Sequence, residues 1–154
     1  MAQTTGAMSG VSLKVQVSNN NSDWTDISGT ANSVTPSGFS RQSGETYTFS
    51  GDHAIIGKGK REPIEFEVNC VYTELDNEAF VLAWAEFDAD DGDALWVRYS
   101  PGGGVTGNAA YTSTTGIVLS CLPPSAEAAP GDPLSASITV KCASVDKSTL
   151  SAAW

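Results

Sequence analysis

The only histidine of this sequence, His53, is its one candidate for imidazole chemistry. Any Ser/His/Asp or Cys/His mechanism would have to use it. It lies in "GDHAIIGKGK", residues 51–60, where three glycines predict flexible backbone. A general base must be held within about 3 Å of its target, which flexible backbone does not favour. The segment is also one residue too long between its first two glycines for a phosphate-binding loop. We therefore expect no catalysis at His53.

Carboxylates are the second group that could do chemistry, and eleven of the eighteen lie between Glu62 and Asp93. Residues 88–93, "DADDGD", are similar to a calcium loop, but the glycine comes at position five instead of six and Tyr99 replaces the bidentate glutamate. No acidic pair has the apolar setting that raises a carboxyl pKa for glycoside hydrolysis. We expect a solvated turn at 88–93, with a weak adventitious cation site as the alternative, and no resident metal or cofactor.

The three cysteines, Cys70, Cys121 and Cys142, form the third group. They contain no CxxC pair and have no histidine close in sequence, so no zinc site is indicated. All three lie in strand-like stretches, and we expect small buried thiols in a reducing compartment. A Cys121–Cys142 disulfide is the alternative.

Composition places these groups in one acidic domain. The chain has 154 residues and a net charge of -10, which repels phosphate backbones and argues against gripping nucleic acid. The same acidity suits a passage through which DNA slides without sticking. No apolar run approaches the roughly 20 residues of a membrane span, and no signal peptide is recognisable. We expect a soluble protein made in the cytosol, without membrane contact.

Alternating apolar and polar residues predict a mainly β fold of about seven strands. The clearest strand begins after Pro63 and places Ile64, Phe66 and Val68 on one face and Glu65 and Glu67 on the other. Other strands or extended segments are expected at 11–18, 24–28, 39–50, 94–100, 116–122 and 134–142. Loops are expected at 30–38, at 101–108 and, as a long mobile loop or hairpin tip, at about 51–61.

One helix is expected at about 76–87. Asp76 is the predicted N-cap, and Leu75 is expected to pack on Phe80. Phe80, Ala83, Trp84 and Phe87 form an apolar stripe that would face a sheet; Asp88 follows it.

These elements predict two packed antiparallel sheets, a β-sandwich or flattened barrel, with the helix on one side. We expect a flexible N-terminal arm at 1–10, a folded domain at 11–145 and a C-terminal tail at 146–154. Unpaired sheet edges would favour assembly with further copies.

The segment around His53 combines apolar and basic residues in a way that is typical of an interface anchor with a charged rim. Ile55 and Ile56 have no periodic apolar partner, and Lys58, Lys60 and Arg61 are the local basic cluster. No aromatic residues interleave with these cations, so the cluster is poor for nucleic acid and better suited to carboxylates of a neighbouring copy. A merely solvated loop is the alternative.

Four pieces of the sequence resemble, in order and spacing, the tail tube proteins of long, non-contractile-tailed bacteriophages. They are "YTFSGDHAIIGKGKREPIEFEVNCVYTELDNEAF", "LWVRYSPGGGVTGNAAYTS", "GIVLSCLPPSAEAAPGDP" and "ASITVKCASV", which together span residues 47–145. The resemblance implies a β-sandwich with a flanking helix, six subunits per ring, and rings stacked into a hollow virion tail through which double-stranded DNA passes. It implies self-assembly, tape measure and terminator proteins as partners, synthesis in the host bacterial cytoplasm, and no enzymatic activity.

The resemblance also assigns surfaces. The segment 51–61 would contact the adjacent ring, and the polar strand face with Glu65 and Glu67 would line the lumen. The predicted ring-to-ring residues are Phe49, His53, Ile55, Ile56, Lys58, Lys60 and Arg61. We expect no added immunoglobulin-like domain, and the basic cluster departs from a uniformly negative inner surface.

Two other classes of protein remain open at this level. One is a carbohydrate- or surface-binding β-sandwich module that uses Trp24, Trp96 and Tyr99 as a stacking platform. The other is the tube subunit of a contractile tail or secretion system, which would need a sheath partner.

Overall fold

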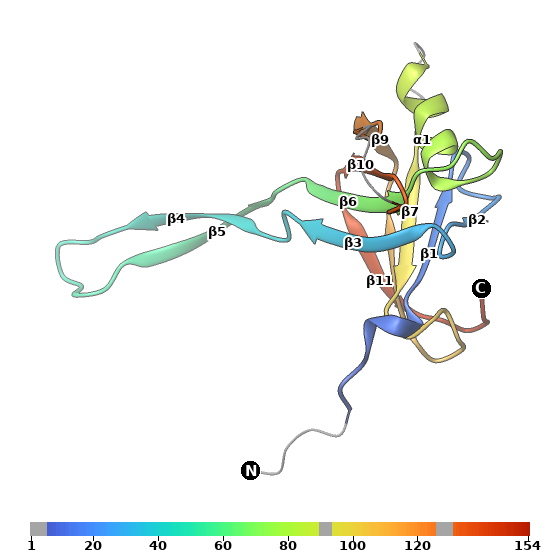
Figure 1. Ribbon diagram of the computed structural model, residues 1–154. Helices are drawn as coiled ribbons and strands as arrows, with labels where there is room; N and C mark the ends of the chain where they lie inside the picture. The colour runs from blue at the N-terminus through green and yellow to red at the C-terminus, as the bar shows by residue number, and fades with distance from the viewer. Residues whose placement is uncertain (1–5, 90–93, 126–130) are drawn as a thin grey trace.

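The computed structural model describes residues 6–89, 94–125 and 131–154. Within these ranges the chain forms antiparallel β-sheets and one α-helix, which confirms the predicted mainly β fold (Figure 1). The elements are η1 Gly10–Ser12, β1 Lys14–Ser18, β2 Thr25–Asp26, β3 Ala31–Ser37, β4 Arg41–Thr46, β5 Ile55–Arg61, β6 Ile64–Val71, α1 Ala79–Asp88, β7 Trp96–Ser100, β8 Ala109–Ser113, β9 Gly116–Leu122, β10 Ser135–Cys142 and β11 Val145–Thr149.

The body of the protein is built from two packed sheets. One has the strand order β11-β8-β7-β1-β2, and the other has the order β3-β6-β10-β9. Val15 and Val97 from the first sheet and Phe66, Val68 and Val140 from the second are almost fully buried in one core. The predicted alternation along β6 is confirmed, since its even-numbered residues from Ile64 to Cys70 are buried. This core fixes the positions of the surfaces described below.

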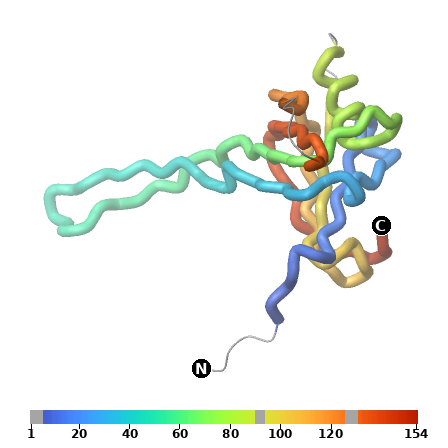
Figure 2. The backbone as a smooth tube through the Cα atoms, viewed as in Figure 1, coloured from blue at the N-terminus to red at the C-terminus, as the bar shows by residue number. Residues whose placement is uncertain are grey.

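Strands β4 and β5 form a third, two-stranded sheet that projects from the body, and we call residues 39–62 the arm (Figures 1 and 2). The arm continues the β3–β6 pair, which ends at Ser37 opposite Glu65. At the junction Gly38 has φ +81°, and a Cβ there would lie 2.2 Å from the carbonyl oxygen of Pro63. The junction therefore requires glycine.

Two segments expected to be loops are strands. Ala31–Ser37 pairs along most of its length with β6, although its Ser, Thr, Asn and Pro residues are typical of a loop. Ile55–Arg61, expected to be a mobile loop or hairpin tip, pairs with Arg41–Thr46. Gly59 lies so close to β4 that a Cβ would be 2.5 Å from the Gln42 carbonyl oxygen. In both cases backbone pairing outweighs local propensity.

The first strand differs from the prediction at its start and on one face. It begins at Lys14, and Val11 lies exposed in η1. The alternation of apolar and polar residues predicts a solvated face with Gln16 and Ser18, but both residues are buried. Both have polar partners, since Gln16 accepts a hydrogen bond from Arg98 and Ser18 donates one to Asn20.

The helix also begins later than predicted. Its N-cap is Glu78, not Asp76, and Asn77 with φ +66° turns the chain immediately before it. Leu75 is largely exposed, whereas Tyr72 packs edge-on against Phe80 with ring centroids 4.9 Å apart. The turn at Asn77 moves the helix start past Asp76, because a residue with positive φ cannot lie in an α-helix.

The C-terminal segment is not a tail. β11 pairs with β8 over five residues, and Trp154 donates its backbone N–H to Gly104. Neither β8 nor β11 was predicted as a strand; β8 joins β11 to the rest of its sheet. At the other end, residues 6–10 of the predicted N-terminal arm are exposed and residues 1–5 lie outside the described residues. The predicted turn at 88–93 also falls largely outside them. No helix in the described ranges has the length and apolar character of a membrane span.

Candidate functional site

The arm gathers all seven residues predicted for inter-ring contact. Phe49 and His53 lie at its tip between the strands, and the other five lie on β5. Phe49, Ile55 and Ile56 are exposed, as is Tyr47, which the sequence reasoning did not assign to the site. His53 forms no hydrogen bond or ion pair with any described residue, so nothing positions its imidazole for general base chemistry.

The cationic side chains of the arm form no salt bridge with any described residue. Arg41 lies directly opposite Arg61, and like charges in that position destabilise a hairpin. Among the described residues, the salt bridges join Lys14 to Asp26 and Lys141 to Glu65, and none involves Lys58 or Lys60. The positive charges of the arm are therefore free to meet an external acidic surface.

The outer face of the four-stranded sheet is polar along β3, β6 and β10 and apolar along β9, where Ile117, Leu119 and Leu122 are exposed. Glu65 and Glu67 lie on this face of β6, and the Glu65 carboxylate forms a 2.7 Å salt bridge with Lys141 on β10. Glu67 is exposed beside hydroxyl residues of its neighbours, Thr35 on β3 and Thr139 on β10. The salt bridge removes part of the negative charge that the sequence predicts for this face.

A cavity of about 360 Å³ lies between α1 and the segments that follow β6 and β9. Its lining is mainly apolar and consists of Tyr72, Thr73, Glu74, Phe80, Val81, Trp84 and Pro123. Sequence reasoning missed this cavity because tertiary folding brings Tyr72 and Pro123 to the helix.

Four aromatic rings run along this side of α1, and we call Tyr72, Phe80, Trp84 and Phe87 the aromatic ladder. Successive centroids are 4.9, 5.8 and 5.8 Å apart. The apolar stripe predicted for the helix is only partly covered by the body. Phe80 and Ala83 are buried, but Trp84 is 41% and Phe87 44% exposed. The outer half of the ladder is therefore an uncovered apolar surface.

The stacking platform proposed for a carbohydrate-binding module does not form. The ring of Tyr99 lies 5.1 Å from Tyr111 and packs edge-on against Phe66 in the core. The neighbouring Arg98 points to the opposite face of β7, where its guanidinium lies 4.0 Å from the Trp24 ring and 4.3 Å from the Trp154 ring. Tyr99 and Trp24 are thus on different faces of the sheet.

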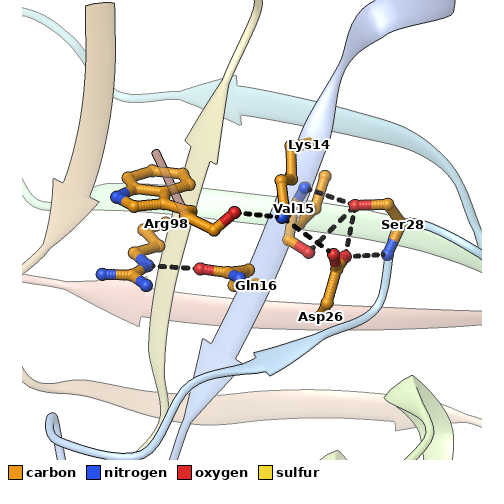
Figure 3. Close-up of polar contacts among 7 residues, drawn as sticks. Lys14, Val15, Gln16, Asp26, Ser28 and Arg98 are labelled. Atoms are coloured by element: carbon orange, nitrogen blue, oxygen red, sulfur yellow. Dashed lines mark hydrogen bonds and ion pairs between the residues drawn. The ribbon is translucent and has the colours of Figure 1, made fainter. Parts of the chain in front are cut away.

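Arg98 and the start of β1 form hydrogen bonds with neighbouring segments (Figure 3). Arg98 Nε donates to Gln16 Oε1 at 2.7 Å, and Lys14 Nζ donates to the Trp154 carbonyl oxygen at 2.7 Å. Burial lowers the pKa of the Arg98 guanidinium. These contacts hold the C-terminal segment against β1 and β7. We call the contacts among Lys14, Gln16, Arg98 and Trp154 the clamp.

Asp26 is the second polar centre in Figure 3. Burial alone would raise its pKa, but hydrogen bonds from the side chain and backbone of Ser28, together with the Lys14 ammonium, lower that pKa below its ordinary value. The Ser28 hydroxyl donates to Asp26 at 2.6 Å and accepts from the Val15 backbone N–H at 2.9 Å. The carboxylate therefore stabilises the β1–β2 corner.

All three cysteines are free and buried, so the alternative Cys121–Cys142 disulfide is wrong. Cys121 is opposite Ile138 and Cys142 is opposite Gly116 in the β9–β10 ladder, which separates the two thiols along the strands. Burial, with a smaller effect of Cys70, raises the pKa of the Cys121 thiol to about 11. The described residues contain no group of three or more His, Cys, Asp or Glu side chains placed to hold a metal ion.

The chain has a fold found in chains of contractile injection systems and of a tail particle. A chain from the PVC sheath–tube complex of an extracellular contractile injection system superposes with TM-score 0.68 at 13% identity, over 95% of this chain and 94% of that chain. A chain from the tube-terminating cap of the anti-feeding prophage gives TM-score 0.65 at 11% identity, over 97% and 96%.

A chain from the tail of an empty GTA particle gives TM-score 0.64 at 11% identity, over 94% of this chain and 99% of that chain. No family model and no curated protein sequence matches. The comparisons therefore support a tail tube fold, and they do not single out the long non-contractile tails that the sequence resembles.

Proposed function

We propose that this protein is a structural subunit of the hollow tube of a phage-tail-like particle, in which copies form hexameric rings that stack. The observation that carries this proposal is the arm, which projects from a tail-tube-like body with its apolar and basic side chains uncovered (Figure 1). An isolated two-stranded hairpin is marginally stable in water, so contact with other copies would stabilise it. Two similar structures are described with sixfold symmetry, the anti-feeding prophage baseplate and the GTA tail.

In this proposal the arm makes the contact between rings. Its apolar tip supplies buried area, and its cations supply pairing with the acidic surface of other copies. The residues assigned to the contact are Phe49, His53, Ile55, Ile56, Lys58, Lys60 and Arg61.

The four-stranded sheet is proposed to join neighbouring subunits within a ring. β3 and β9 are its outermost strands, and β9 exposes Ile117, Leu119 and Leu122. Edge strands with free backbone groups and exposed apolar residues favour pairing with another chain. The polar outer face with Glu65 and Glu67 would then line the lumen, where double-stranded DNA passes without specific binding.

The proposed role requires no enzymatic activity and no cofactor. The protein would be made in the host bacterial cytoplasm and reside in the virion tail, with tape measure and terminator proteins as further partners. Residues 11–145 would supply the tube domain together with the β11 strand.

Negative-stain electron microscopy of the purified protein tests this function. We expect hollow filaments or stacked rings whose end-on views have sixfold symmetry. A protein that stays monomeric in sedimentation up to millimolar concentration would contradict the proposal.

The tube of a contractile particle is the second candidate. It is favoured by the similarity to a chain from a sheath–tube complex. Particles isolated from producing cells with an antibody to this protein would distinguish the two. A bare tube identifies a non-contractile tail, and a tube inside an outer sheath identifies a contractile one.

A further inference from the structure

The arm tip and the aromatic ladder are two uncovered apolar surfaces on the same chain. The arm points away from the body, and α1 lies at a different side of it (Figures 1 and 2). The tip therefore cannot reach the ladder of its own chain. A contact between them has to join two copies through different surfaces, and such heterologous contacts propagate into rings or open filaments.

The cavity at the ladder has the size for a side chain. Its volume of about 360 Å³ lies at the lower end of the range for ligand pockets, which suits an aromatic ring with its neighbour and not a whole strand. Phe49 is the most exposed large apolar residue among those described, and it lies at the very end of the arm. Phenylalanine packs well beside Phe80 and Trp84, since offset and edge-on ring contacts are favourable.

Charge favours the same pairing. The sequence from Glu62 to Asp93 contains eleven acidic residues and no basic residue, and it includes α1 and the segment before it. Glu74 lines the cavity, and Asp88 lies on the same helix face as Val81 and Trp84, at spacings of seven and four residues. Lys58 and Lys60 of the arm have no ion pair within the described part of the chain.

The dimensions limit which charges can meet. Ser43 pairs with Lys58, and Phe49 lies six residues beyond Ser43, so Lys58 lies about 20 Å behind Phe49 along the arm. Asp88 lies about 10 Å along α1 from Val81, which lines the cavity. With Phe49 in the cavity, the long Lys58 side chain therefore reaches toward Asp88, whereas both lysines are too far back to face Glu74 in the cavity wall.

A second cavity, of about 530 Å³, lies at the root of the arm and is lined by Phe39, Arg41, Arg61 and Glu62 among others. Two arginines in its wall would oppose the cations of an incoming arm, because like charges repel. The cavity beside α1 is therefore the better receiver.

We propose that the aromatic ladder receives the arm tip of a second copy in the next ring, with Phe49 in the cavity and Lys58 facing Asp88 at the end of α1. This inference rests on the proposed tube function and names the receiving site that this function leaves open.

Photo-crosslinking of the assembled full-length protein tests the contact. Phe49 is replaced by p-benzoylphenylalanine, filaments are irradiated, and crosslinked peptides are mapped by mass spectrometry. We expect adducts between copies within residues 72–84. Filaments with adducts only at the arm root, for instance at Phe39 or Arg61, would overturn this inference and leave the tube function intact. A protein that forms neither filaments nor intermolecular adducts overturns both.

Charge reversal gives an independent test at two exposed residues. Lys58→Glu and Asp88→Lys should each raise the critical concentration for assembly about 2- to 5-fold. The two changes together should restore assembly toward the wild-type value. Asp132→Lys, in an exposed loop before β10, controls for the loss of acidic charge. A double variant no better than the two single changes acting additively would refute the pairing.

Discussion

Replacing Ile55 and Ile56 together by serine should leave a folded protein that elongates poorly. The two residues are 61% and 72% exposed, so the uncovered surface amounts to a little more than one whole isoleucine. Burying an aliphatic side chain contributes about 1.5–3 kcal/mol, which puts the loss at about 2–4 kcal/mol per arm if the contact covers both residues. At 1.4 kcal/mol per factor of ten, the critical concentration should rise about 30- to 700-fold.

The assay is sedimentation of assembled protein over a concentration series, with circular dichroism and urea unfolding to verify the fold. The body should unfold as in the wild type, because neither side chain contributes to the core. The matched control changes both residues to valine, which removes one methylene from each. That loss is about 1 kcal/mol and predicts only about a fivefold rise. If the serine variant assembles at the wild-type concentration, the arm has no part in assembly.

Three further predictions concern the body. Arg98→Ala should lower the free energy of unfolding by about 1–3 kcal/mol in urea titrations, because the buried Gln16 Oε1 loses its donor; an unchanged midpoint would contradict the clamp. The lowered pKa of Asp26 means that its stabilisation is present above its ordinary value of 3.8 and is lost as the pH falls through the lower folded-state pKa. The stability difference between wild type and Asp26→Asn should therefore shrink below that pH, and a constant difference would refute the assignment. Because the Cys121 thiol is buried with a pKa of about 11, a thiol reagent at pH 8 should label it only on unfolding; rapid labelling of the native protein would contradict its burial.

Strands that bury one face were predictable from sequence, and most strands without a buried face were not. β6 and β10 bury every second residue, so period-two alternation identifies them directly. β3 and β5 bury little, and their partners across the sheet determine their conformation; β4 is exposed as well, but it lies within the segment 39–50 that was expected to be extended. β11 lies at a sheet edge with mostly exposed residues, which explains why its segment was expected to be a tail.

The candidate site was likewise predictable only where a local sequence pattern marks it. Two adjacent isoleucines without a periodic partner and a basic cluster are visible in the sequence, and they indicated an interface segment at about 51–61, although that segment was expected to be a loop or hairpin tip. The receiving cavity depends on Tyr72 and Pro123 meeting α1, and no local pattern reports that meeting. The turn at Asn77 was likewise invisible, because positive φ at asparagine depends on its surroundings.

The two-stranded build of the arm has a kinetic consequence. A hairpin covered on neither face has to be ordered when it docks, and the first few copies have the fewest contacts to offset that entropy cost. Growth should therefore start after a lag and become rapid on preformed seeds. Under the proposed function, such a threshold would keep newly made subunits apart until a template is present.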